Sequence, residues 1–302
     1  MSRLSYEGWE PPHLSYSTVS GYRDCGMRTK LQRVLKVEQR PGLAACGGNA
    51  VHTATEIIDR GESEDGDWCI SCAGAHHLPP RKDCLAVAAH VTVSDIFQQG
   101  WAEAVEKNKE WSPSFEVGDY TVTGRATAAY GGKQNLQWWM DNGPGMVQNW
   151  IDWREKNGWD IWETPEGAPA IELELNIVLP NDIPVKMFLD RVMVTPTGQI
   201  TVVDIKSGRT PETGEQLGLY ATAMELAFGA MFRPAWGYFW DARKGEHSSP
   251  IPLDSYTPEY FAEVYAEAVR GINAGCFLAK PANNCFNWCG VRDACPAFHA
   301  SR

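Results

Sequence analysis

The clearest pattern of apolar and polar positions in this 302-residue chain lies between residues 170 and 274. Apolar, β-branched runs at 170–179, 185–194 and 200–205 predict three strands, and turn residues at 195–199 join the last two as a hairpin. A helix at 214–229, a strand at 235–240 and a helix at 258–274 follow. This order predicts an α/β fold with a mixed central sheet flanked by helices.

The first half of the chain has mainly helical periodicity. A helix entry and an amphipathic helix are expected at 15–37, with Ser17 or Ser20 as the N-cap. The remaining segments are a helix at 47–59, a loop-like insertion at 61–83, a helix at 85–111, a short hairpin at 115–127 and a tryptophan-rich helix at 134–157. The length suits one large domain or two small ones, and we expect a single domain over 1–302.

Composition restricts the location of the protein. Hydrophobic residues make up 43% and charged residues 22% of the chain, which is ordinary for a soluble protein. Residues 1–12 have no apolar core, and the most apolar run, at 221–232, is interrupted by Glu225. We therefore expect a cytoplasmic (intracellular) protein with no membrane partner. Cysteines in intracellular proteins bind metals more often than they form disulfides, and we expect the same of the nine cysteines here.

The net charge of −11 argues against a nucleic-acid coat protein. Nucleic-acid binding depends on a local basic surface, however, and the basic residues between Arg23 and Arg40 could supply one. The alternative is a solvated helix face. The 13 tryptophans could stack on unpaired bases, but core packing is the expected role of most of them.

The hairpin carries the candidate chemistry. Asp190 lies in its first strand, and Asp204 and Lys206 share one face of the second strand because strand side chains alternate. Two carboxylates beside an ammonium group could hold a divalent metal and position a water molecule. The alternative is a solvated surface hairpin.

Asp190, Asp204-x-Lys206 and the following Gln216-x-x-x-Tyr220 together resemble the PD-(D/E)XK nuclease superfamily, specifically its RecB-like branch. Gln216 and Tyr220 share one helix face directly after the strand. The resemblance implies a restriction-endonuclease-like fold. It also implies catalytic roles for all five residues and an Mg²⁺ or Mn²⁺ ion held by Asp190, Asp204 and the backbone carbonyl of Ile205.

Two further features fit this resemblance. His52, on the predicted helix at 47–59, is similar to the superfamily's upstream histidine, whose neutral imidazole completes the metal shell. Glu172 and Glu174 lie on the strand before Asp190, where the superfamily often carries a glutamate, and are expected to point to the same face. Either glutamate could support the metal, or both could face solvent.

The cysteine spacing resembles the iron–sulfur subgroup of RecB-like nucleases, which includes CRISPR-associated adaptation nucleases and AddB-type nucleases. Cys25 stands near the N-terminus, and Cys285, Cys289 and Cys295 are clustered near the C-terminus. The resemblance implies a 4Fe–4S cluster held by these four thiolates, which joins segments 14–40 and 276–302. A zinc ion on the same cysteines is the alternative.

The insertion at 61–84 has potential ligands of its own. Cys69, Cys72, His76, His77 and Cys84 supply enough nitrogen and sulfur ligands for a tetrahedral zinc ion. Nothing in the nuclease resemblance predicts such a site, and the alternative is a flexible loop with free thiols.

The sequence therefore predicts a metal-dependent deoxyribonuclease, by resemblance an exonuclease on single-stranded DNA ends in recombination, repair or DNA processing. One alternative is a non-catalytic DNA-binding module that docks on a helicase, recombination or integrase partner. Another is a structural zinc protein whose carboxylates are incidental.

Overall fold

The computed structural model describes residues 3–63, 92–123, 133–282, 285 and 289–300. In this part of the chain, seven strands form one mixed sheet with the order β1-β3-β4-β5-β6, to which β2 adds by pairing with β3 and β7 by pairing with β5. The strands are β1 Asp160–Ile161, β2 Ile171–Val178, β3 Pro184–Val194, β4 Ile200–Lys206, β5 Trp236–Asp241, β6 Glu246–His247 and β7 Ile251–Pro252.

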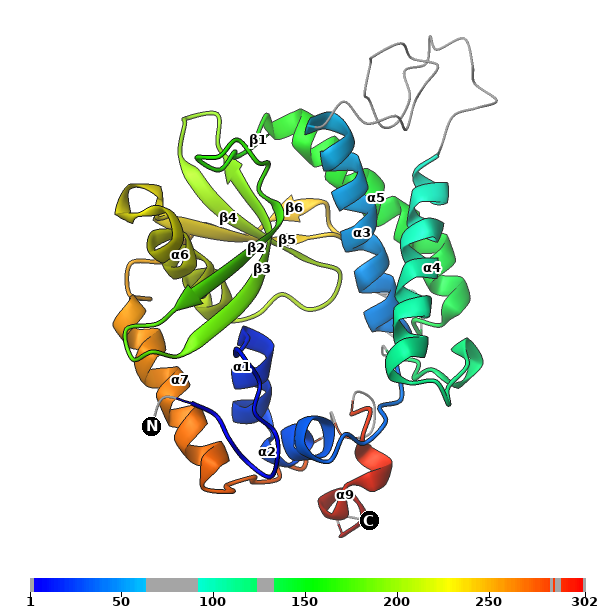
Figure 1. Ribbon diagram of the computed structural model, residues 1–302. Helices are drawn as coiled ribbons and strands as arrows, with labels where there is room; N and C mark the ends of the chain where they lie inside the picture. The colour runs from blue at the N-terminus through cyan, green and yellow to red at the C-terminus, as the bar shows by residue number, and fades with distance from the viewer. Residues whose placement is uncertain (1–2, 64–91, 124–132, 283–284, 286–288, 301–302) are drawn as a thin grey trace.

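Helices cover both faces of this sheet (Figure 1). Three of them, α3 Leu43–Ser63, α4 Val93–Trp111 and α5 Leu136–Asn157, pack together on one face. On the other face lie α6 Glu215–Phe228, α7 Pro258–Asn273 and α1 Tyr16–Asp24. The mixed α/β architecture predicted from the sequence is therefore confirmed.

The strand pairing places the end of β4 beside the end of β5 and the middle of β3. β3 pairs antiparallel with β4, with Val194 opposite Ile200, and β4 pairs parallel with β5, with Lys206 opposite Asp241. A parallel neighbour needs a crossover connection, and α6 supplies it. The connection 207–214 therefore leads from the end of β4, where the predicted catalytic lysine lies, to the start of α6.

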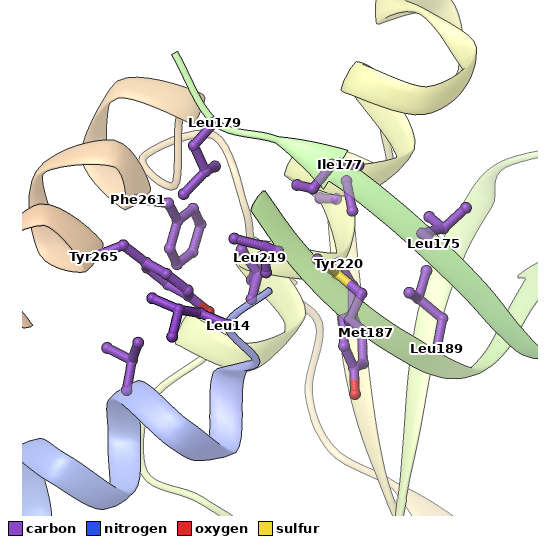
Figure 2. Packing of buried hydrophobic residues seen from close by; sticks show 14 of the residues in the cluster. Leu14, Leu175, Ile177, Leu179, Met187, Leu189, Leu219, Tyr220, Phe261 and Tyr265 are labelled. Carbon is purple, nitrogen blue, oxygen red and sulfur yellow. The ribbon is translucent and has the colours of Figure 1, made fainter. Parts of the chain in front are cut away.

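Two apolar clusters stabilise the layers. Figure 2 shows the first, in which Leu219 and Tyr220 of α6 pack with side chains of β2, β3 and α7. The second lies between α3, α4, α5 and the opposite sheet face. Most of the tryptophans singled out from the sequence are core residues, because Trp139, Trp150, Trp153, Trp159 and Trp162 are each at most 8% exposed.

Close helix packing explains two glycines. A Cβ atom on Gly47 of α3 would lie 2.1 Å from the ring of Trp139, and one on Gly143 of α5 would lie 2.1 Å from the ring of Phe97. Both positions exclude any side chain, because real Cβ contacts never come that close. The apolar surface of α3 is thereby pressed against α4 and α5, which fixes the helix that carries His52.

The N-terminal segment is less regular than predicted. The Oγ atom of Ser15, rather than Ser17 or Ser20, accepts the capping hydrogen bond, from the amide of Thr18. The helix ends at Cys25, whose backbone is extended, and α2 Gly26–Thr29 and the π-helix Lys30–Val34 follow. A Cβ atom on Gly26 would lie 3.0 Å from the backbone of 277–278, so the approach of the C-terminal segment accounts for this break.

The ends of the chain are in contact at two places. Met27 donates a backbone hydrogen bond to Leu278 at 3.1 Å, and Arg40 donates one to Gly290 at 2.9 Å. A short helix, α9 Pro296–Ala300, follows. These hydrogen bonds join the described N-terminal and C-terminal segments at two points.

Two other predictions need correction. The helix bearing His52 is longer than predicted, at Leu43–Ser63, and its apolar face extends toward the N-terminus to Leu43 and Cys46. The predicted hairpin around Gly118 is wrong: a 3₁₀ helix, Val117–Asp119, occupies its turn, Thr121 bridges to Gly42 and Thr123 to Gln134. Of the described helices, none combines the length and the apolar character needed to span a membrane.

Candidate active site

The β3–β4 hairpin brings the two predicted aspartates together in a buried position. Asp190 is 8% and Asp204 1% exposed. The amide of Ile205 donates a hydrogen bond to Oδ2 of Asp190 at 2.8 Å, which ties the first carboxylate to the second strand. This contact fixes the Asp190 carboxylate beside the strand that carries Asp204 and Lys206.

Lys206 links the hairpin to the first turns of α6. Its Nζ atom lies 2.6 Å from Oδ2 of Asp204 and donates a hydrogen bond to Oε1 of Gln216 at 3.2 Å. Gln216 in turn donates from Nε2 to the hydroxyl of Tyr220 at 2.7 Å. Four of the residues predicted from the sequence therefore form one continuous chain of contacts.

His52 approaches Asp190 from α3. Its Nδ1 atom lies 3.5 Å from Oδ2 of Asp190 and 3.8 Å from Oε1 of Glu172. One potential ligand atom from each of these three residues lies within 4.8 Å of the other two, a spacing that a single metal ion can bridge. Segments more than a hundred residues apart in the sequence supply this group.

Glu172 reaches this position through an unusual backbone conformation. Its φ angle is +46°, in the left-handed region that residues with a side chain seldom adopt. The alternation of β2 breaks there: Glu172 turns toward His52, while Glu174 pairs with Lys186 at 2.7 Å near the surface. Of the two glutamates considered from the sequence, only Glu172 lies in the group with His52 and Asp190.

The electrostatics of the group favour a bound cation. Burial raises the pKa of Asp190, and burial together with the charge of Asp190 raises the pKa of Asp204 to about 7. Burial alone lowers the pKa of His52, but Asp190, Glu172 and Asp204 outweigh it and raise that pKa to about 9. Carboxylates that resist ionisation side by side are stabilised by a divalent ion between them.

The donor set suits Mg²⁺ or Mn²⁺. It consists of carboxylate oxygens and one imidazole nitrogen, and hard divalent ions prefer such ligands to sulfur. Asp204 is not one of these three residues. Its carboxylate contacts Lys206, on the side of the site that faces α6. The structure thus adds Glu172 to the residues placed around Asp190.

The sequence profile of the PD-(D/E)XK nuclease superfamily matches residues 13–296 of the chain. The chain belongs to this superfamily. The Gene 69 protein of Mycobacterium phage D29 is 30% identical over 290 residues, which cover 95% of this chain and 97% of that protein. The Gene 69 protein of Mycobacterium phage L5 is 27% identical over 309 residues, with the same coverage of each chain.

Membership of the PD-(D/E)XK superfamily agrees with the geometry of the hairpin. The order of these residues along the chain is His52, Asp190, Asp204, Lys206, Gln216 and Tyr220, and their side chains meet beside the middle of β3 and the end of β4. A superfamily of nucleases implies DNA as the bound partner and a divalent metal at this site. The names of the two phage proteins add nothing about activity.

One cavity near the C-terminal end of α1 is lined by all four cysteines predicted to bind the cluster. These are Cys25, Cys285, Cys289 and Cys295. The rest of the cavity wall is formed by Arg28, Leu31, Ala279, Lys280, Pro281, Val291, Arg292, Ala297 and Phe298. Burial raises the pKa of the Cys289 thiol, and the nearby Cys285 and Cys25 raise it further.

Other sequence features have plainer roles or lie outside the described residues. Cys69, Cys72, His76, His77 and Cys84 fall within 64–91, which the structure does not describe, and zinc binding there stays a prediction. Cys46 is fully buried and accepts a hydrogen bond from Asn108. Part of the basic run is ion-paired, since Arg23 contacts Glu215 and Arg28 contacts Asp24.

Sequence reasoning missed a second layer of charge behind the metal group. Arg191 and Asp59 are both completely buried and form an ion pair at 2.5 Å. A signal was available in the sequence, because Arg191 is a charged residue inside an apolar strand.

Proposed function

We propose that this protein is a metal-dependent deoxyribonuclease of the RecB-like type that acts as an exonuclease on single-stranded DNA ends. The observation that carries the proposal is the contact chain from Asp204 through Lys206 and Gln216 to Tyr220, beside a group of three potential metal ligands. The preference for single-stranded ends rests on the resemblance to RecB-like nucleases.

His52, Glu172, Asp190 and Asp204 would hold Mg²⁺ or Mn²⁺, together with the carbonyl of Ile205. When bound, such an ion polarises the scissile phosphate and lowers the pKa of a bound water. The contribution of the chain is a set of fixed dipoles and charges around the reacting phosphate.

Lys206 has the central role among the protein groups. Asp204 and Gln216 hold its ammonium group from two sides, so that its remaining proton can face the attacking water and the charge that develops on the phosphate. Tyr220 is 4% exposed and keeps Gln216 in place through its hydroxyl. Burial holds the pKa of Tyr220 well above its ordinary value, so this hydroxyl stays protonated and serves as an orienting group.

A non-catalytic DNA-binding module that docks on a helicase, recombination or integrase partner is the second candidate. Such a module has no need for a half-buried lysine held between a carboxylate and an amide. When ionised, clustered carboxylates also oppose the binding of polyanionic DNA unless a cation joins them. The geometry therefore favours catalysis.

We further propose that Cys25, Cys285, Cys289 and Cys295 hold a 4Fe–4S cluster. The cavity that all four line supports this proposal. A zinc ion on the same cysteines is the alternative.

End-labelled and circular substrates test the exonuclease proposal. Incubation with Mn²⁺ should shorten linear single-stranded DNA from an end and leave a closed single-stranded circle intact. Equal cleavage of the circle would replace the exonuclease by an endonuclease, and faster degradation of linear duplex would remove the single-strand preference. No cleavage of any substrate would favour the DNA-binding module.

Iron analysis tests the cluster. The purified protein should be brown and contain about four irons per chain, and Cys25→Ser or Cys289→Ser should lose the visible absorbance. Cys46→Ser is the matched control, because Cys46 lies away from the cavity and contacts Asn108. A colourless protein with one zinc per chain on these cysteines would contradict the proposal.

A further inference from the structure

Arg191 is the most buried charged group behind the candidate metal ligands. It lies in the middle of β3, its side chain is 0% exposed, and it points toward α5 and toward α3, the helix that also carries His52. Its guanidinium plane lies 5.8 Å from the centre of the Trp150 ring. A buried cation of this kind must be compensated by well-placed acceptors, and those acceptors show what it does.

The first acceptor is a potential ligand itself. Nη1 of Arg191 lies 3.4 Å from Oε1 of Glu172, the carboxylate oxygen that faces His52. Glu172 has the left-handed backbone described above, so its side chain needs an outside contact to stay turned toward the site. The guanidinium supplies that contact.

The second acceptor is the backbone of another ligand. The same Nη1 atom donates to the carbonyl oxygen of Asp190 at 2.5 Å. Because Asp190 also accepts from the amide of Ile205, its peptide and its carboxylate are each held by one strong hydrogen bond. One nitrogen atom of Arg191 thus spans from Glu172 on β2 to Asp190 on β3.

The third acceptor leads to the histidine. Nη2 of Arg191 donates to the hydroxyl of Thr55 at 3.1 Å, and this hydroxyl donates to the carbonyl oxygen of His52 at 2.9 Å. Thr55 is 0% exposed and lies one turn after His52 on α3. The position of α3 relative to the sheet is therefore set, at the level of His52, by the same guanidinium group.

Asp59 anchors the arrangement from behind. Its Oδ2 atom accepts from Nε of Arg191 at 2.5 Å, and its carboxylate also accepts from Arg154 and from the indole of Trp150. Two arginines share this one buried carboxylate, so positive charge remains to face Glu172. The rigid, planar fork of an arginine can hold such a set of acceptors at fixed spacing, which a lysine cannot do.

We propose that Arg191 is a positioning residue that fixes the spacing of His52, Glu172 and Asp190 and thereby sets the affinity of this group for its divalent ion. The inference rests on the proposed metal site, because it assigns a role to a residue that touches the ligands and not the reacting atoms. It predicts that metal affinity depends on the shape of the Arg191 side chain as well as on its charge.

Binding of Mn²⁺ alone, followed by electron paramagnetic resonance and calorimetry, tests the proposal without reference to cleavage. Arg191→Lys keeps the charge and loses the fork, and its dissociation constant for Mn²⁺ should rise at least tenfold while the protein still unfolds cooperatively. Cleavage should recover at saturating Mn²⁺, so that the KM for the metal rises much more than kcat falls.

Two further variants keep the test decisive. Arg233→Lys is the matched control, because Arg233 also pairs with a carboxylate, Glu225, and donates to two carbonyl groups, at the far end of α6. Its Mn²⁺ affinity should equal that of the wild type. Thr55→Val removes only the hydroxyl between Arg191 and His52, and should weaken Mn²⁺ binding about threefold to tenfold even if Arg191→Lys does not fold.

The outcomes separate the inference from the function on which it rests. A wild-type protein that binds no Mn²⁺ would overturn both. Wild-type affinity in Arg191→Lys, or in Thr55→Val should the lysine variant not fold, would overturn the positioning role alone. Tighter binding in Arg191→Met would also overturn it, because charge repulsion would then be the main effect of the guanidinium on the metal.

Discussion

Replacing Asp204 by asparagine should stabilise the metal-free protein while it removes cleavage. Asp204 is 1% exposed, and its pKa is raised from 3.8 to about 7, first by burial and then by Asp190, despite the ammonium of Lys206 2.6 Å away. One pKa unit corresponds to about 1.4 kcal/mol, so ionisation of this group opposes folding by up to about 4 kcal/mol at pH 8.

The sign of the effect fixes its pH dependence. Because the folded-state pKa of Asp204 is raised, the destabilisation that its ionisation causes is absent below the unfolded pKa of 3.8. It grows as pH rises toward 7 and is complete above about 7. Asparagine has nearly the same shape and no charge. The free energy of unfolding of Asp204→Asn should therefore exceed that of the wild type by roughly 1–4 kcal/mol at pH 8, and by about half as much at pH 5.5.

Urea unfolding of EDTA-treated protein at the two pH values measures this difference. Asp241→Asn is a suitable control, since Asp241 lies opposite Lys206 on β5 but pairs with Lys244 in a more exposed position. The control should show no gain that grows with pH. Equal or lower stability of Asp204→Asn at pH 8 would show that the site is not strained by its own negative charge.

Three further predictions concern the ligands and the packing. Glu172→Asn should stabilise the metal-free protein by about 1 kcal/mol, because asparagine tolerates a φ of +46° better than glutamate does, and it should weaken Mn²⁺ binding. Lower stability of this variant in urea unfolding would contradict backbone strain at Glu172. The pKa of His52 is about 9 in the metal-free protein, so Mn²⁺ binding at pH 8 should release about one proton, and His52→Gln should abolish the release. Calorimetry in buffers of different ionisation enthalpy measures the number of protons released. A wild type that releases none would contradict the raised pKa. Gly143→Ala should destabilise the protein by about 1–3 kcal/mol in thermal unfolding, because the added methyl group clashes with Phe97. Gly145→Ala in the same helix has no atom within 4 Å of the added Cβ and should be neutral or slightly stabilising.

The hairpin and α6 could be predicted from the sequence because their signals are local. Alternation, turn residues and the i, i+4 spacing of Gln216 and Tyr220 all act within a few residues. The predicted boundaries of β3, β4 and α6 differ from the observed ones by no more than one residue at each end. Short pairing segments such as β1 and β6 were not predicted, because a two-residue strand has no periodicity of its own.

The ligand role of Glu172 could not be settled from the sequence. Strand alternation places Glu172 and Glu174 on one face, and only their three-dimensional contacts, His52 beside Glu172 and Lys186 beside Glu174, show which one reaches the metal group. The break at Cys25 has a similar origin, because the backbone of 277–278 arrives from the other end of the chain. Contacts between residues so far apart in the sequence produce no periodic pattern of apolar and polar positions.

The most direct test of the proposed function compares cleavage of end-labelled single-stranded DNA by the wild type, Lys206→Ala and Lys186→Ala in Mn²⁺ and in EDTA. Lys186 lies on the same hairpin and pairs with Glu174 near the surface, so its loss should leave the rate within about twofold. We predict Mn²⁺-dependent cleavage by the wild type and a loss of at least a hundredfold in Lys206→Ala, with unchanged folding and iron content. Wild-type rates in Lys206→Ala, or full activity in EDTA, would contradict the proposed metal-dependent nuclease site.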